Sequence, residues 1–140
     1  MFHVFLLSCS MLDNLKIASL NVNCLGNPLK RKGVLEKLKK DGSHVAFLQE
    51  THLSKKEQAK FKFPGYSTFY STWSNSRQRG LTTLISKLLN FDLLDEVGDK
   101  GGRYLIVKVR VNNVVITLIT LMCIFLPNVI EHSLSCFLML

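Results

Sequence analysis

The sequence predicts an α/β fold, and three observations carry that prediction. Short apolar segments rich in Val, Ile and Leu alternate with turn residues, which is typical of strands. One long lysine-rich segment instead has its apolar residues at helical spacing. A strand, this helix and a second strand follow one another within residues 15–50, which indicates a βαβ-like unit.

The first three elements have clear signals. Residues 15–21 (LKIASLN) and 44–50 (HVAFLQE) are predicted strands. The helix between them spans residues 27–42, with Asn27 as its cap, Pro28 in its first turn and Gly42 at its stop. Six Lys or Arg residues cover the helix outside its apolar stripe, so we interpret that side as a solvated face.

The remainder of the chain is predicted to be mostly β-structure. A short helix is expected at 54–61, and strands are expected near 66–73, 81–85, 104–111 and 114–124. Gly101-Gly102 and Asn112-Asn113 are turn signals, and the second pair suits a tight hairpin. The sequence contains no internal repeat and no internal domain boundary, so one domain is expected.

Charge and cysteine usage narrow the class of protein. The net charge is +8, and ten of the 18 basic residues lie between positions 30 and 62. This excess favours an anionic partner such as nucleic acid, although by itself it argues only for steering and solubility. The four cysteines are widely spaced, which favours neither a zinc site nor a disulfide framework and suits a reducing compartment.

The two ends of the chain have a different composition. Residues 1–14 are apolar but lack the basic start of a signal peptide, so we interpret them as a leader of unknown role. The apolar run 114–126 is shorter than the roughly 20 residues of a spanning helix and suits a buried strand. A membrane segment within 114–140 remains an alternative, although it would contain Pro127 and Glu131.

The stretch FLQETH (residues 47–52) places a carboxylate at the end of an apolar strand. A half-buried Glu50 is costly unless a cation or a hydrogen-bond network pairs with it. The candidates are a basic side chain, a structural network or a metal ion. A lone Glu at a strand end is more often a solvated or salt-bridged surface group.

Two motifs carry a family resemblance. IASLNVNCLG (17–26) followed by VAFLQETHL (45–53) resembles the opening of the endonuclease/exonuclease/phosphatase superfamily. The nearest likeness is to the apurinic-type endonuclease domain of LINE-type retrotransposons, which is similar to exonuclease III. Three later segments continue it: 77–86, 101–109 and, more loosely, 119–128. The resemblance implies the N-terminal half of a DNase I-like α/β sandwich, with one mixed sheet carrying helices on one face. The opposite face should be apolar and exposed unless residues 129–140 fold over it.

The resemblance also implies a chemistry. In such nucleases the acid of the QET motif binds magnesium, which assigns Glu50 as a metal ligand here. Asn21 would lie beside it and hold the metal or the scissile phosphate. Magnesium, or manganese in its place, prefers oxygen ligands, so a carboxylate and an amide suit it. DNA would be the partner, with no small-molecule cofactor.

Further residues are assigned less directly. Asn23 often has a polar counterpart in the superfamily, but a turn explains it equally well. Arg77 and Arg79 lie in a basic loop that suits phosphate contacts, or in a plain hairpin loop. We interpret His52 as structural, because the essential histidine of the family lies much later in the chain.

The departures from the family predict an inactive fragment. Phe125 replaces a tyrosine, Cys123 replaces an asparagine, and the late Gly-Asp-x-Asn and Asp-His motifs are missing. The sequence thus divides into a leader (1–14), a partial nuclease domain (15–128) and a non-homologous apolar tail (129–140). The alternatives are a non-catalytic basic nucleic-acid-binding remnant and a small membrane-associated protein. We expect a nuclear or cytoplasmic chain that self-associates through an uncovered apolar face.

Overall fold

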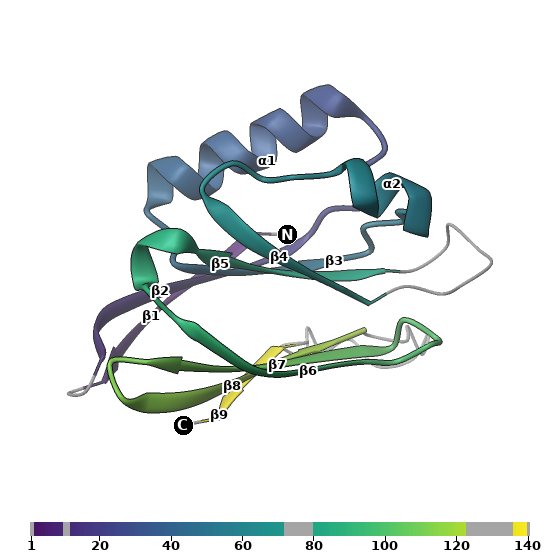
Figure 1. Ribbon diagram of the computed structural model, residues 1–140. Helices are drawn as coiled ribbons and strands as arrows, with labels where there is room; N and C mark the ends of the chain where they lie inside the picture. The colour runs from purple at the N-terminus through teal and green to yellow at the C-terminus, as the bar shows by residue number, and fades with distance from the viewer. Residues whose placement is uncertain (1, 10–11, 72–79, 123–135, 140) are drawn as a thin grey trace, which may run out of the picture.

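The computed structural model describes residues 2–9, 12–71, 80–122 and 136–139, which form a helical layer and two β-sheets. The helices cover one face of the first sheet, and the second sheet packs against its other face (Figure 1). The predicted α/β class is confirmed. Within the described residues no helix has both the length and the apolar character needed to cross a membrane.

The first sheet has the strand order β1-β2-β3-β5-β4. Its strands are β1 (Phe2–Cys9), β2 (Leu12–Asn21), β3 (Val45–Gln49), β4 (Tyr66–Ser71) and β5 (Leu81–Ser86). β2 and β3 are parallel, whereas the pairs β1–β2, β3–β5 and β4–β5 are antiparallel. The mixed sheet that the family resemblance implies is therefore present, and its parallel β2–β3 pair agrees with the βαβ-like signal.

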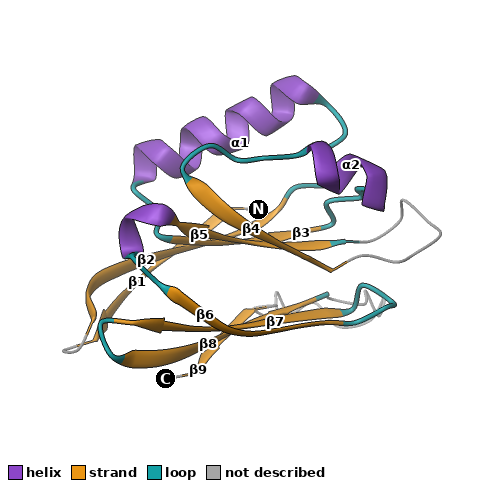
Figure 2. Ribbon diagram, in the orientation of Figure 1, coloured by secondary structure: helices purple, strands orange, loops and turns teal. Residues whose placement is uncertain are grey.

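The second sheet has the order β6-β7-β8-β9 and is antiparallel throughout (Figure 2). Its strands are β6 (Asp92–Gly98), β7 (Tyr104–Val111), β8 (Val114–Leu121) and β9 (Cys136–Met139). A short 3-10 helix, η1 (Lys87–Leu89), leads from the first sheet into the second. The turn between β7 and β8 has positive φ at Asn112 (49°) and Asn113 (65°), as a tight hairpin requires.

The helices begin and end where the sequence predicts. α1 (Pro28–Asp41) is capped by Asn27, whose Oδ1 accepts a hydrogen bond from the Leu29 N–H at 2.8 Å. It ends at Gly42, whose φ of 65° suits glycine. α2 (Lys55–Lys60) starts with a capping box in which Ser54 and Glu57 satisfy each other's backbone N–H groups.

Each face of the first sheet builds its own apolar core. On the helical side, Leu38 of α1 packs with Leu48 of β3 and Leu84 of β5, all fully buried. On the other side, Phe47 of β3 packs with Leu118 of β8 between the sheets. Because successive strand residues point to opposite faces, β3 contributes to both cores and is buried along its whole length.

The expectation of one sheet with an uncovered apolar face is wrong. Strands β6, β7, β8 and β9 form a second sheet that covers this face. Ile116 and Leu118 are 2% and 0% exposed between the two sheets. An uncovered face would have left them in water. The layers pair instead because each sheet has an apolar face to bury.

Three strands were not predicted: β1, β6 and β9, the last of which lies in the tail assigned to 129–140. Residues 2–9, assigned to the leader, form β1 along the edge of β2. β6 was missed because three of its seven residues are acidic and it shows no apolar alternation. All seven are exposed, since β6 is an edge strand. Beyond it, a 2.7 Å hydrogen bond from Arg103 Nε lowers the pKa of the Asp99 carboxyl to about 2.

Candidate metal and phosphate site

The site is built at the edge of the first sheet where β2 and β3 end together. The two strands are parallel, and Asn21 at the end of β2 lies opposite Gln49 at the end of β3. Glu50 is the next residue after β3. The parallel pairing therefore brings Asn21 and Glu50, which lie 29 positions apart in the sequence, to the same edge.

Backbone hydrogen bonds join the two segments beyond the strand ends. The N–H groups of Cys24 and Leu25 donate to the carbonyls of Glu50 (2.7 Å) and Thr51 (2.9 Å). On the other side, the Thr51 N–H donates to the Gly80 carbonyl at 3.1 Å. Glu50 is thus held by the backbone between two neighbouring segments, so its position is set by the fold and not by a free loop.

Four non-glycine residues at this edge have a positive φ. They are Asn23 (40°), Cys24 (74°), Glu50 (55°) and His52 (51°). Residues other than Gly and Asn adopt this region at a cost of about 1–3 kcal/mol each, and they persist there only when the surroundings impose it. Such strain gathers at functional sites, and here the hydrogen bonds on both sides of Glu50 hold it in place.

The side-chain oxygens at the edge differ in availability. Asn21 Oδ1 accepts a 3.1 Å hydrogen bond from the Asn23 N–H, which is the local turn that the sequence left open as an alternative. An amide oxygen has a second lone pair that remains for another partner. The Glu50 carboxylate is half-exposed and has no hydrogen-bond or ion-pair partner among the described residues.

This donor set matches a hard divalent cation in kind. A carboxylate and an amide oxygen are ligands that magnesium takes, and magnesium commonly keeps several waters as well. The set is small, however. In the described part of the chain no group of three or more His, Cys, Asp or Glu side chains is placed to hold a metal.

Two cations of α1 support the loop that carries Asn23. Lys30 Nζ donates to the Asn23 carbonyl at 2.7 Å. Arg31 Nη1 donates to the Leu25 carbonyl at 2.7 Å, and its guanidinium lies 3.6 Å from the centre of the Phe61 ring. The sequence alone predicted that both cations belong to a solvated face of the helix. Only their position in the first helical turn, directly after the motif, could have indicated these contacts.

The other predicted residues are placed as follows. Asn23 lies in the loop two residues beyond the end of β2, exposed to solvent. His52 is half-buried, and no ion pair or side-chain hydrogen bond joins it to another described residue. Four positions that the sequence singled out lie outside the described residues: Arg77, Arg79, Cys123 and Phe125. Gly80, which follows Arg79, lies against Thr51 at the site.

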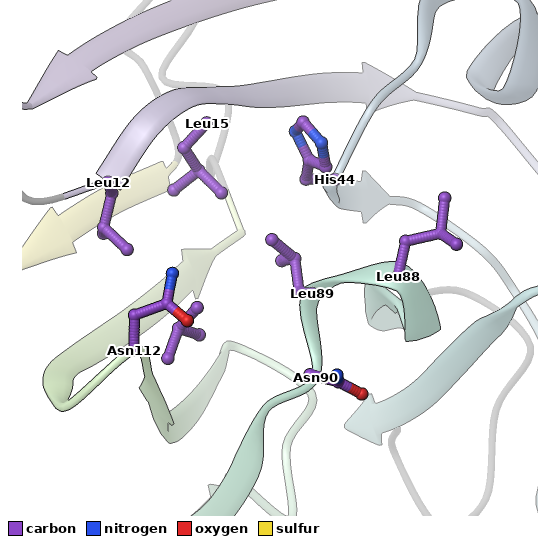
Figure 3. A pocket seen from close by; sticks show the side chains of 8 residues that line it. Leu12, Leu15, His44, Leu88, Leu89, Asn90 and Asn112 are labelled. Atoms are coloured by element: carbon purple, nitrogen blue, oxygen red, sulfur yellow. The ribbon is translucent and has the colours of Figure 1, made fainter.

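A pocket of about 220 Å³ lies at the opposite end of β2 and β3 (Figure 3). Leu12 and Leu15 line it from β2, together with His44, η1 and the β7–β8 turn. The Nδ1 atom of His44 accepts a 3.0 Å hydrogen bond from the Lys16 N–H, so its imidazole helps hold β2. Because the strands are parallel, this pocket is separate from the Asn21 and Glu50 edge.

Comparisons with known proteins agree with this architecture. No protein-family model matches the chain. An uncharacterized 149 kDa protein of transposon TX1 from Xenopus laevis is 33% identical over 99 residues, which span 69% of this chain and 7% of that protein. The AP endonuclease LMAP from Leishmania major superposes with a TM-score of 0.55 and 22% identity, over 69% of this chain and 35% of that one.

The chain thus spans about a third of the endonuclease and a small part of the transposon protein. The predicted resemblance to apurinic-type endonucleases is confirmed at the level of the fold. Over 69% of its length the chain has the α/β architecture of an AP endonuclease, and its sequence is similar to part of a transposon protein.

Proposed function

We propose that this chain forms the metal-binding part of a divalent-cation-dependent nuclease that cleaves phosphodiester bonds in DNA. The proposal rests on one observation above all: the fold brings Asn21 and Glu50 to a single strained edge of the sheet. The similarity to a transposon protein and the fold of an AP endonuclease agree with it. We assign this role to residues 15–128 and a nuclear or cytoplasmic setting.

Each residue of the edge has a role in this proposal. Glu50 and Asn21 would hold magnesium or manganese through their side-chain oxygens. When bound, the ion polarises the phosphate and stabilises charge on the leaving oxygen. Glu50 contributes the charge and Asn21 contributes a neutral oxygen. Lys30 holds the loop that leads from Asn21 to α1. Asn23, Arg77 and Arg79 are proposed phosphate contacts.

Manganese provides a direct test of the metal site. We expect Mn²⁺ to broaden the amide resonances of residues 21–25 and 50–52 before those of other residues, because its paramagnetism acts over short distances. Glu50→Gln removes the charged ligand and keeps the shape of the side chain. It should weaken Mn²⁺ binding at least about tenfold, which corresponds to about 1.4 kcal/mol.

Glu36→Gln provides a matched control. Glu36 is exposed on α1 and forms only a 3.7 Å pair with Lys32, so its loss changes the net charge equally without altering the edge. Its Mn²⁺ affinity should equal that of the parent chain. Broadening centred on other residues, or equal losses in both variants, would contradict the assigned site.

We further expect no magnesium-dependent nicking of plasmid DNA by these 140 residues alone. Hydrolysis needs a positioned nucleophile and usually a base, besides charge stabilisation. The edge supplies a carboxylate and an amide, and the sequence lacks the Gly-Asp-x-Asn and Asp-His motifs. Gel assays of supercoiled plasmid with magnesium or EDTA check this. Magnesium-dependent nicking that disappears in Glu50→Ala would refute the expectation.

A further inference from the structure

The net positive charge of the molecule is concentrated in its helical layer. Residues 28–41 and 54–62, which contain both helices, have ten Lys or Arg and three Asp or Glu. Residues 92–121, which form β6, β7 and β8, contain four basic and four acidic residues. Since these parts lie on opposite faces of the first sheet, seven of the eight net positive charges belong to the helical side (Figure 1).

Most acidic residues of the helical side already form contacts within their own helix or its cap. Asp41 pairs with Lys37 at 3.1 Å, and Glu36 pairs with Lys32 at 3.7 Å, each within one turn of α1. Glu57 accepts from the Ser54 N–H at 2.8 Å in the α2 cap. Among the described residues, no carboxylate forms an ion pair with the exposed side chains of three further lysines: Lys39, Lys60 and Lys62.

These lysines belong to one continuous surface. The Arg31 guanidinium lies over the Phe61 ring at one end of α1. Two helical turns later, Lys39 Cε lies 3.9 Å from where a Cβ on Gly65 would be. The segment 61–65 therefore runs alongside α1, with Lys60 and Lys62 near the Arg31 end of this run and Lys39 at its other end.

We infer that this helical layer binds the phosphate backbone of duplex DNA, at a surface distinct from the Asn21 and Glu50 edge. α1 has 14 residues and is about 21 Å long, which matches about six base pairs of duplex. The surface presents exposed lysines, so it neutralises phosphates without reading sequence. This inferred binding goes beyond the proposed cleavage site, because it requires neither the metal nor Glu50.

An anionic membrane would be a competing partner, but the structure favours nucleic acid. A helix that lies in a membrane surface inserts a large apolar face. The apolar residues of α1 point the other way: Leu38 is fully buried, and Val34 and Leu35 pack against the core. Leu29 is the large hydrophobic residue of α1 that remains exposed. The solvent-facing surface of the helical layer is therefore mainly charged.

The test measures binding of a fluorescent 20-base-pair duplex to the full chain by anisotropy, in EDTA and over a series of salt concentrations. The variant combines Lys39→Gln, Lys60→Gln and Lys62→Gln, since glutamine retains helix propensity. Each lost phosphate contact should lower the slope of log affinity against log salt by about 0.9. We expect the slope to fall by about 2 to 3, with a loss of affinity of at least about tenfold at low salt.

The control removes the same charge from the opposite layer, through Lys100→Gln, Lys108→Gln and Arg110→Gln. All three residues are exposed in or beside β7. The inference requires this triple variant to keep nearly the parental slope. Equal losses in both variants would overturn it, because binding would then follow net charge alone. Chain that floats with phosphatidylserine vesicles and leaves the duplex unbound would also overturn it.

The result is independent of the cleavage proposal. Duplex binding is measured in EDTA, so it does not depend on a metal ion at the edge. A chain that binds no Mn²⁺ at the edge but still loses duplex affinity in the helical variant would refute only the metal site. A chain that binds Mn²⁺ and shows no helical effect would refute only this inference.

Discussion

Leu118→Lys should abolish cooperative folding of the chain. Leu118 is fully buried between the two sheets, packed in the same core as Phe47 and Leu105. A lysine there would bury an unpaired charge, which costs about 3–5 kcal/mol or more. Small domains are stable by only about 5–15 kcal/mol, so this loss removes most of the margin. Ile116→Lys, two residues earlier on the same face, should have the same effect.

The neighbouring residue provides the control. Ile119 lies opposite Ile106 on the outer side of the second sheet and is partly exposed. A lysine there can extend its ammonium group into water, so Ile119→Lys should retain a cooperative thermal transition. Circular dichroism melts distinguish the two variants. A folded Leu118→Lys chain with improved solubility would mean that the sheets do not pack together and that the face is uncovered.

The sequence was informative where local chemistry determines structure. Asn27, Pro28 and Gly42 located α1 correctly, because caps and stops depend on only a few adjacent residues. Asn112-Asn113 located the β7–β8 turn for the same reason. The parallel β2–β3 pair followed from the βαβ pattern, since a helical crossover is what joins parallel strands.

The layer arrangement was not predictable in the same way. Nothing in residues 104–121 specifies whether their apolar face meets helices, a second sheet or water. That choice depends on contacts between distant segments, such as the 3.0 Å hydrogen bond between the buried hydroxyls of Thr83 and Thr120. β6 is an extreme case, because an exposed edge strand needs no apolar pattern.

For the candidate site, the sequence predicted which residues take part but not their backbone conformation or supporting contacts. It singled out Asn21 and Glu50 through the two motifs. It did not predict the positive φ at Glu50 or the support of the Asn23 loop by Lys30. Strain of this kind depends on the backbone partners that Glu50 and Thr51 find in Cys24 and Gly80 after folding.

Phe47→Ala should lower the free energy of unfolding by about 3–5 kcal/mol. Phe47 is 2% exposed in the core between the sheets, in the strand that leads directly to Glu50. Its truncation removes a large apolar contact and leaves a cavity. Leu48→Ala tests the other face of the same strand, where Leu48 packs beneath the helices, and should cost about 2–5 kcal/mol.

Urea denaturation of both variants measures these two losses independently. In a single sheet with one open face, Phe47 would be solvated, and its replacement would cost little more than a surface change of about 0.5 kcal/mol. A large cost for Leu48→Ala with a negligible cost for Phe47→Ala would therefore contradict the packed two-sheet arrangement. Comparable losses would show that β3 is held from both faces. The segment that carries Glu50 would then be as rigid as the core itself, as a preformed ligand position requires.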